Sequence, residues 1–178
     1  MILDRDGVIN EDPGYLWRIE DCRFVAGIFD LTREFAARGF AIVIATNQAG
    51  IGRGLFTEAQ FQSLMDWISA QFLRHGVVID RIYHCPDHPT AGIGAYRRAS
   101  AWRKPAPGML LQAAADLELD LTRSWCVGDK ASDIEAARAA GVGTLVRLDP
   151  ARPAVVRSGD CWSVPDLGSI VSLLKSLE

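Results

Sequence analysis

The segment Met1-Ile2-Leu3-Asp4-Arg5-Asp6-Gly7 places two carboxylates, Asp4 and Asp6, directly after a short apolar run. Asp and Gly are common turn residues, so these letters alone favour a solvated turn. The same arrangement also suits an open parallel sheet, in which functional side chains follow the carboxyl ends of the strands. The rest of the sequence has to distinguish these two interpretations.

Strands and helices are expected to alternate along the chain. Short apolar runs predict strands at 40–45, 77–83, 125–127 and 144–146, and helical patterns predict helices at 28–38, 57–75, 108–119, 133–140 and 165–177. The helix that begins at Thr57 carries a capping-box pattern with Gln60. This alternation predicts an α/β fold, a Rossmann-like parallel sheet with helices on both faces.

Length and composition restrict the class of protein. The 178 residues are 49% hydrophobic and 23% charged, which is typical of one globular domain spanning residues 1–178. The formal charge of −3 argues against general affinity for nucleic acid. The sequence lacks an apolar run of the ~20 residues that a membrane span needs, a signal-peptide pattern and any CxxC. We therefore expect a cytoplasmic monomer with free thiols and no nucleic-acid or membrane partner.

Polar residues follow several of the predicted strands. Asp4 and Asp6 follow the first strand, Thr46-Asn47-Gln48 the second and Gly128-Asp129 a later one, and Lys104 is expected beside them. Parallel strands bring such residues to one edge of the sheet. Clustered carboxylates repel one another unless a cation joins them, and hard oxygen ligands select Mg²⁺. With a lysine and a hydroxyl to hold phosphoryl oxygens, the pattern predicts metal-assisted phosphoryl transfer with a carboxylate nucleophile.

Four motifs give the chain a family resemblance. They are Asp4-Arg5-Asp6-Gly7-Val8, Thr46-Asn47-Gln48, Arg103-Lys104-Pro105, and Gly128-Asp129-Lys130 with Asp133. The order and rough spacing of these motifs resemble those of the haloacid dehalogenase superfamily of aspartate-nucleophile phosphatases. Residues 9–15, 46–54, 56–58 and 104–109 resemble the group that contains the D-glycero-D-manno-heptose 1,7-bisphosphate and histidinol-phosphate phosphatases. The resemblance implies a haloacid dehalogenase-like fold without a large cap domain, in which the strand before Asp4 is central.

The resemblance also implies a role for each matching residue. Asp4 would be the nucleophile that forms an aspartyl-phosphate, and Asp6 would be the general acid and then the base. Thr46 and Lys104 would hold the transferring phosphoryl oxygens. Mg²⁺ would be held by Asp4, the Asp6 carbonyl and Asp129, with Asp133 behind them. Substrate contacts would come from Asp12, Pro13, Gly14, Tyr15, Asn47, Gln48, Ala49, Arg53, Arg103 and Lys130.

Some of these residues have simpler interpretations. Lys130 and Asp133 also fit a solvated pair on an exposed helix, and Arg53 also fits a solvated loop residue. Ala49 stands where relatives often have serine, so one hydroxyl group to the substrate is missing.

The loop before Arg103 departs from the group. Relatives often bind a structural zinc ion through a Cys-Pro-His start and a later Cys-x-Cys, and Ser100-Ala101-Trp102 lacks both later cysteines. A structural zinc site normally has four ligands rich in Cys and His. We therefore expect Mg²⁺ and no structural zinc, while weak zinc binding by Cys85 with His84, Asp87 or His88 stays open. Apolar packing of Ile93, Tyr96 and Trp102 is expected to hold this loop instead.

The favoured function is a Mg²⁺-dependent phosphatase in lipopolysaccharide or nucleotide-heptose biosynthesis. The resemblance implies that it removes the C7 phosphate of D-glycero-D-manno-heptose 1,7-bisphosphate. Histidinol phosphate is an alternative substrate, and a nucleic-acid 3′-phosphate is a weaker one because the chain is acidic. A receiver-like signalling module also combines Asp, Thr, Lys and Mg²⁺, but it leaves Asp6 unexplained. A non-catalytic relative is the remaining alternative, and the intact set of carboxylates argues against it.

Overall fold

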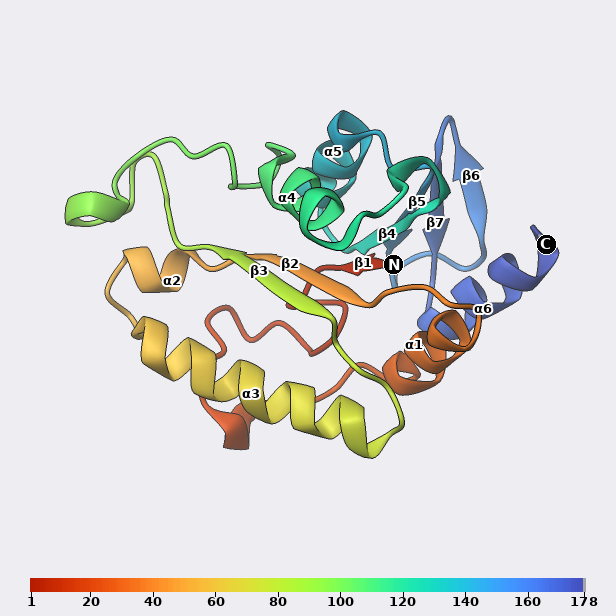
Figure 1. Ribbon diagram of the computed structural model, residues 1–178, viewed down its shortest axis with the longest axis horizontal. Helices are drawn as coiled ribbons and strands as arrows, with labels where there is room; N and C mark the ends of the chain where they lie inside the picture. Colours follow the sequence, from red (N-terminus) through yellow and green to blue (C-terminus); the bar gives the residue numbers. More distant parts are fainter. Residues whose placement is uncertain (178) are drawn as a thin grey trace.

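A seven-stranded sheet crosses the molecule (Figure 1). The computed structural model describes residues 1–177. The strand order is β3-β2-β1-β4-β5-β7-β6, and every neighbouring pair is parallel except β6 and β7. The strands are β1 (Ile2–Leu3), β2 (Val43–Asn47), β3 (Arg81–Cys85), β4 (Trp125–Gly128), β5 (Thr144–Leu148), β6 (Val156–Ser158) and β7 (Cys161–Val164).

Helices cover both faces of the sheet. They are α1 (Ile28–Ala37), α2 (Ala49–Gly52), α3 (Glu58–Arg74), α4 (Gly108–Leu117), α5 (Ala131–Ala140) and α6 (Leu167–Ser176). Helices α1, α3 and α6 lie on one face, and α4 and α5 lie on the other (Figure 1). The predicted α/β fold with a Rossmann-like parallel sheet is therefore confirmed, whereas the assignment of residues 1–178 to one domain stays a prediction.

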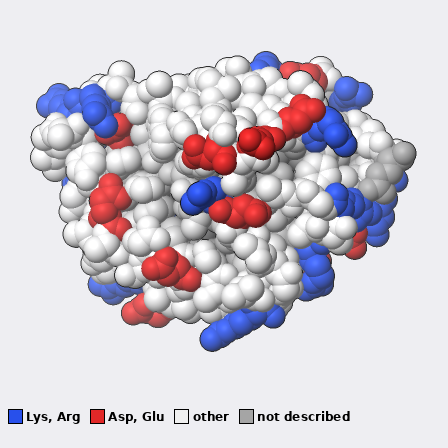
Figure 2. Space-filling model, viewed as in Figure 1, with Lys and Arg blue, Asp and Glu red and all other residues white. Residues whose placement is uncertain are grey.

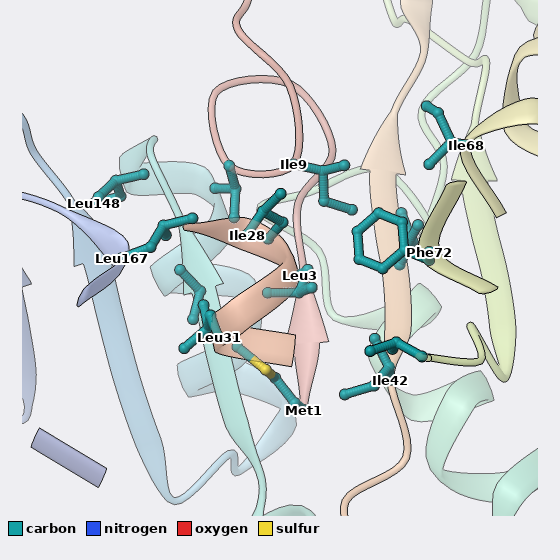
Figure 3. Packing of buried hydrophobic residues seen from close by; sticks show 14 of the residues in the cluster. Met1, Leu3, Ile9, Ile28, Leu31, Ile42, Ile68, Phe72, Leu148 and Leu167 are labelled. Atoms are coloured by element: carbon teal, nitrogen blue, oxygen red, sulfur yellow. The ribbon is translucent and has the colours of Figure 1, made fainter. Parts of the chain in front are cut away.

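The two faces of the sheet have separate apolar cores. Successive residues of a strand point to opposite faces, so Leu3 packs in the core with α1, α3 and α6 while Ile2 packs in the core with α4 and α5. Figure 3 shows Leu3, Ile28 and Leu31 directed toward one another beside β1. This burial on both faces explains why the strands read as continuous apolar runs.

The short strand β1 lies at the topological switch point of the sheet. The chain runs from β1 outward to β2 and β3, then crosses to β4 on the other side of β1. The carboxyl ends of β1, β2 and β4 therefore meet at one edge, where ligands bind in sheets of this kind. The central position expected for the strand before Asp4 is confirmed.

Two strands lie later in the sequence than expected. Strand β2 begins at Val43 rather than residue 40, because its register is set by Ile2 of β1. Strand β3 begins at Arg81 rather than residue 77, because Arg81 is the partner of Val43. In each case the neighbouring strand determines where pairing begins.

The hairpin of β6 and β7 was not expected. All three residues of β6 are exposed, so this strand has no apolar signal. Gly159 and Asp160 form the two residues between the paired Ser158 and Cys161, and a Gly-Asp pair in that position is a hairpin signal. By contrast, the capping box at Thr57 is present: Thr57 Oγ1 accepts a 3.1 Å hydrogen bond from the Gln60 backbone N–H.

Charged side chains are dispersed over the face of the molecule that Figure 2 shows. Acidic and basic groups both occur there, and some of them lie directly side by side (Figure 2). Across residues 1–177, no helix has both the length and the apolar character that crossing a membrane requires. The expected absence of nucleic-acid and membrane partners and the monomeric state stay predictions.

Candidate active site

Three carboxylates lie together where β1 and β4 end. Asp4 directly follows β1, Asp129 directly follows β4, and Asp133 lies in the first turn of α5. One oxygen of each carboxylate lies within 4.8 Å of one oxygen of each of the other two. Asp133 is buried, and its Oδ2 accepts a 3.0 Å hydrogen bond from the Lys130 backbone N–H. The interpretation of Asp133 as part of a solvated pair is therefore wrong.

Lys104 is the buried cation of this cluster. Its Nζ lies 2.9 Å from Asp4 Oδ1 and 2.5 Å from Asp133 Oδ1, and it donates a 2.7 Å hydrogen bond to the Ala45 carbonyl. Burial by itself would lower the pKa of Lys104, but the two carboxylates outweigh burial and raise this pKa. Lys104 is therefore a protonated ammonium group.

Negative charge exceeds positive charge in the cluster, because three carboxylates face one buried ammonium group. Burial raises the pKa of Asp4 despite the attraction of Lys104, and Asp133 adds to the rise. Burial raises the pKa of Asp129 to about 6, and Asp4 and Asp133 again add to the rise. Asp129 Oδ1 is buried and accepts no hydrogen bond from residues 1–177. The cluster thus has an excess of negative charge on oxygen atoms and one buried oxygen that accepts no hydrogen bond from the described residues. Both features fit the binding of a divalent cation such as Mg²⁺.

Gly7 allows the loop after β1 to approach Asp129. Its φ is +88°, in the left-handed region that favours glycine. A Cβ atom at this position would meet the Asp129 carboxylate. The glycine in the opening motif is therefore required by both its backbone conformation and this close approach.

Mg²⁺ binding is expected to weaken below about pH 6. Asp129 must lose its proton to hold the cation, and its pKa is raised to about 6. The affinity should therefore fall about tenfold per pH unit well below this pKa, and change little above pH ~7. Isothermal titration calorimetry across this range measures the effect. Asp129→Ala should weaken binding throughout while the circular dichroism spectrum stays unchanged, and an unchanged affinity in that variant would remove Asp129 from the site.

The metal-free protein should show the opposite trend in stability. The folded protein keeps the Asp129 proton to a higher pH than the unfolded chain does, since folding raises this pKa from 3.8 to about 6. The free energy of unfolding should therefore decrease as the pH rises through this window. Urea unfolding in the presence of a chelator measures this decrease, and the slope should be smaller in Asp129→Ala.

The Asp6 carboxylate is surrounded by hydrogen-bond donors. Arg5 donates through Nε at 2.9 Å and through Nη2 at 2.7 and 2.8 Å. Asn10 Nδ2 and Gln48 Nε2 each donate at 3.0 Å. Asp6 also lines the pocket described below. Its surroundings thus differ from those of Asp4, which faces an ammonium group and two carboxylates.

The Thr46-Asn47-Gln48 segment joins these groups at the end of β2. Thr46 Oγ1 is buried and accepts a 2.8 Å hydrogen bond from Gln48 Nε2, the same amide nitrogen that contacts Asp6. The Asn47 side chain holds the Lys104 backbone by two hydrogen bonds, to its carbonyl at 2.9 Å and from its N–H at 3.0 Å. Asn47 therefore also serves to place Lys104.

A pocket of about 290 Å³ opens beside these residues. Its walls are made by Asp6, Gly14, Tyr15, Asn47, Gln48, Ala49, Gly50, Arg103, Lys104, Lys130 and Ser132. Two larger hollows lie elsewhere, one of about 480 Å³ beside α3 and one of about 600 Å³ beside β3, and neither is lined by Asp6 or Lys104. The pocket at Asp6 has three basic side chains in its wall, those of Arg103, Lys104 and Lys130, and it therefore suits an anionic ligand.

Three of the predicted substrate contacts do not line the pocket. Asp12 accepts from Lys130 Nζ at 2.9 Å, and Pro13 is exposed. Arg53 reaches the pocket only through Tyr15, to whose hydroxyl its Nη1 donates at 2.5 Å. Gly50 and Ser132 line the pocket and were not predicted. Gly50 directly follows Ala49, and Ser132 directly precedes Asp133. Glycine has no side chain and a single serine is common in loops, so neither residue gave a chemical signal.

The loop before Arg103 is held by both apolar and polar contacts. Ile93 is 66% exposed, so its expected packing is wrong. Tyr96 packs against the core, and Trp102 is 38% exposed with its ring edge-on to Tyr83. Arg103 Nη1 donates to the Asp87 carbonyl at 3.1 Å. Trp102 therefore packs only partly, and the Asp87 carbonyl holds the Arg103 side chain.

The residues near Cys85 have partners within the protein. Cys85 is buried, and His84 Nε2 lies 2.7 Å from a carboxylate oxygen of Glu58. The buried Asp87 carboxylate lies 3.0 Å from Arg98 Nε. These contacts occupy two of the candidate zinc ligands, and the expectation of no structural zinc stays a prediction.

Comparisons with known proteins identify the family. Residues 101–159 match the HAD-hydrolase-like family. The chain is 42% identical to a D-glycero-beta-D-manno-heptose-1,7-bisphosphate 7-phosphatase of Yersinia pestis, over 100% of this chain and 94% of that protein. It is 48% identical to a D-glycero-alpha-D-manno-heptose-1,7-bisphosphate 7-phosphatase of Burkholderia mallei, over 89% of this chain and 88% of that protein.

A solved structure agrees with these relatives. The D,D-heptose 1,7-bisphosphate phosphatase from B. bronchiseptica, complexed with magnesium and phosphate, superposes with a TM-score of 0.84 at 27% identity. The match covers 100% of this chain and 98% of that one. The chain therefore belongs to the haloacid dehalogenase-like hydrolases, within the family of phosphatases to which these heptose bisphosphate phosphatases belong.

Proposed function

We propose that this enzyme hydrolyses the C7 phosphate of D-glycero-D-manno-heptose 1,7-bisphosphate in the cytoplasm, acting as a monomer on a small sugar phosphate. The observation that carries the proposal is the buried Asp4 beside Lys104, which lines a pocket whose wall also holds Arg103 and Lys130. A bisphosphate needs two anion sites, one at the reacting group and one farther out. The pocket supplies a cation for each.

Asp4 is the proposed nucleophile. One of its carboxylate oxygens attacks phosphorus, a new O–P bond forms, and the bond from phosphorus to the C7 oxygen breaks. The Lys104 ammonium group and the Thr46 hydroxyl hold the phosphoryl oxygens, where they stabilise the charge that develops in the transition state. The product of this step is an aspartyl-phosphate on Asp4 and a free sugar hydroxyl.

Asp6 is the proposed group that moves the proton. It donates a proton to the C7 oxygen as that oxygen leaves, and then accepts one from the water that attacks the aspartyl-phosphate. The second step breaks the bond between Asp4 and phosphorus, releases phosphate, and returns Asp4 to a carboxylate and Asp6 to its protonated form. Mg²⁺, held by Asp4, the Asp6 carbonyl and Asp129 with Asp133 alongside, would neutralise charge on the phosphoryl group.

Arg103→Ala is expected to raise KM with little change in kcat. Arg103 is proposed to bind the phosphate at C1, which does not react. This contact is equally strong in the ground state and the transition state, so the Arg103 substitution weakens substrate binding without raising the barrier of the chemical step. A charged hydrogen bond contributes about 1.5–3 kcal/mol, which corresponds to roughly a 10- to 150-fold change in KM. Steady-state kinetics on the bisphosphate measure this change.

The matched control for Arg103 is Arg123→Ala, which alters an exposed arginine beyond the other end of β4. KM should be unchanged in this variant. A large fall in kcat with unchanged KM in Arg103→Ala would contradict a binding role.

A phosphate-release panel with Mg²⁺ tests the proposed substrate. The panel compares the alpha and beta anomers of heptose 1,7-bisphosphate with histidinol phosphate and a 3′-phosphorylated oligonucleotide. At least one anomer should have the highest kcat/KM, by about 100-fold or more over the other substrate classes. A preference for histidinol phosphate or for the oligonucleotide would overturn the proposed substrate but retain the phosphatase chemistry.

A further inference from the structure

Arg5 lies between the two catalytic carboxylates in sequence and is fully buried. Its relative exposure is 0%, although an arginine in a polar loop is normally solvated. Neither the chemistry proposed for Asp4 nor that proposed for Asp6 requires a charged side chain at this position. A buried guanidinium group therefore needs an explanation of its own.

The guanidinium group of Arg5 binds the Asp6 carboxylate. Nε and Nη2 together contact both oxygens of Asp6, at 2.7–2.9 Å. Such a fork-like contact fixes the orientation of a carboxylate as well as its position, because two parallel N–H donors must align with it. The Asp6 side chain is 14% exposed and lines the pocket, so its orientation decides what the substrate meets.

Other parts of the chain hold Arg5 in turn. Nη2 also donates to the Leu16 carbonyl at 3.1 Å, and the Cζ atom lies 5.7 Å from the centre of the Phe61 ring on α3. Phe61 is buried in the core. Contacts with a distant loop and with a helix thus restrict the Arg5 side chain, and Arg5 in turn holds the Asp6 carboxylate.

We propose that Arg5 is a positioning residue: its guanidinium group fixes the Asp6 carboxylate at the pocket wall, where Asp6 exchanges a proton with the leaving oxygen. This inference rests on the acid–base role proposed for Asp6. Arg5 touches no reacting atom, and its effect on turnover passes through Asp6. Precise orientation of an acid–base group contributes strongly to catalysis, since proton transfer depends on hydrogen-bond distance.

A double-mutant cycle with Arg5→Met and Asp6→Asn tests this dependence. Arg5→Met alone should lower kcat/KM for the sugar bisphosphate by about 100-fold, within the range for loss of general acid catalysis. In the Asp6→Asn background the same change should have almost no further effect, because the group that Arg5 positions is already disabled. If the two losses multiply instead, Arg5 acts by another route and the proposal is wrong.

The leaving group supplies a second readout. p-Nitrophenolate leaves without needing a proton, so Arg5→Met should lower kcat/KM for p-nitrophenyl phosphate by less than about threefold. An equal loss on both substrates would indicate general damage to the site. Arg74→Met, at the exposed end of α3, is the matched control: it makes the same substitution at an arginine outside the site, and both substrates should be hydrolysed as by the wild type.

Arg5→Lys is a second variant that can be used if Arg5→Met does not fold. Lysine keeps the positive charge but cannot make the two-donor contact of a guanidinium group with the Asp6 carboxylate. The kcat/KM of Arg5→Lys for the sugar bisphosphate should therefore lie between those of the wild type and Arg5→Met. If Arg5→Met does not fold, the cycle is run with Arg5→Lys, and non-additivity is again the expected result. Wild-type inactivity on the heptose bisphosphate would overturn the proposed substrate alone, since the cycle can be measured on any alkyl phosphomonoester that this phosphatase hydrolyses and whose leaving oxygen needs a proton.

Discussion

Asp4→Asn is expected to lower kcat by about 10⁴-fold or more while the protein stays folded. An amide has nearly the same shape as a carboxylate, but its oxygen is too weak a nucleophile to attack phosphorus. The variant retains a polar group beside Lys104, and Lys104 retains its ion pair with Asp133. Substrate binding should therefore survive the loss of turnover.

Three measurements separate chemistry from folding in Asp4→Asn. They are phosphate release, the thermal midpoint of unfolding, and calorimetric binding of the bisphosphate with Mg²⁺. Asp66→Asn, on the exposed surface of α3, is the matched control and should have wild-type activity. Turnover within about tenfold of wild type in Asp4→Asn would require a different nucleophile, such as a directly activated water.

Lys104→Met is expected to reduce both catalysis and stability. The ammonium group is buried between Asp4 and Asp133, so its removal leaves two carboxylates facing each other without a protein cation. Breaking a buried ion pair in this way typically costs about 3–5 kcal/mol of folding free energy. Loss of a donor to the phosphoryl oxygens should also lower kcat by about 10²- to 10³-fold.

Denaturant unfolding and steady-state kinetics measure the two effects of Lys104→Met. Added Mg²⁺ should recover part of the stability, because a cation at the carboxylates offsets their repulsion. Lys175→Met, at an exposed position near the end of α6, controls for the general loss of a lysine. Unchanged stability in the absence of Mg²⁺ would mean that Lys104 does not balance the charge of these carboxylates.

The location of the site could be predicted because it depends on strand ends. A parallel sheet places the residues after β1, β2 and β4 at one edge, and Asp4, Thr46 and Asp129 directly follow or complete these strands. Lys104 was expected there through a motif, and Asn47 places it by bonding its backbone. Strand ends and a motif were therefore enough to predict that these residues lie at one edge of the sheet.

Features that depend on distant contacts could not be predicted. The burial of Arg5 requires the Leu16 carbonyl and the Phe61 ring, which are 11 and 56 residues away in the chain. The register of β3 depends on β2, and the position of Arg103 depends on the Asp87 carbonyl. Polar side chains in a loop carry no pattern that reveals such partners.

The most direct test of the proposed activity is ³¹P nuclear magnetic resonance of heptose 1,7-bisphosphate during incubation with the enzyme and Mg²⁺. The signal of the C7 phosphate should disappear as inorganic phosphate appears, while the C1 phosphate signal remains. Asp4→Asn under the same conditions should leave both sugar phosphate signals unchanged. Loss of the C1 phosphate first, or no release from either anomer by the wild-type enzyme, would contradict the proposal.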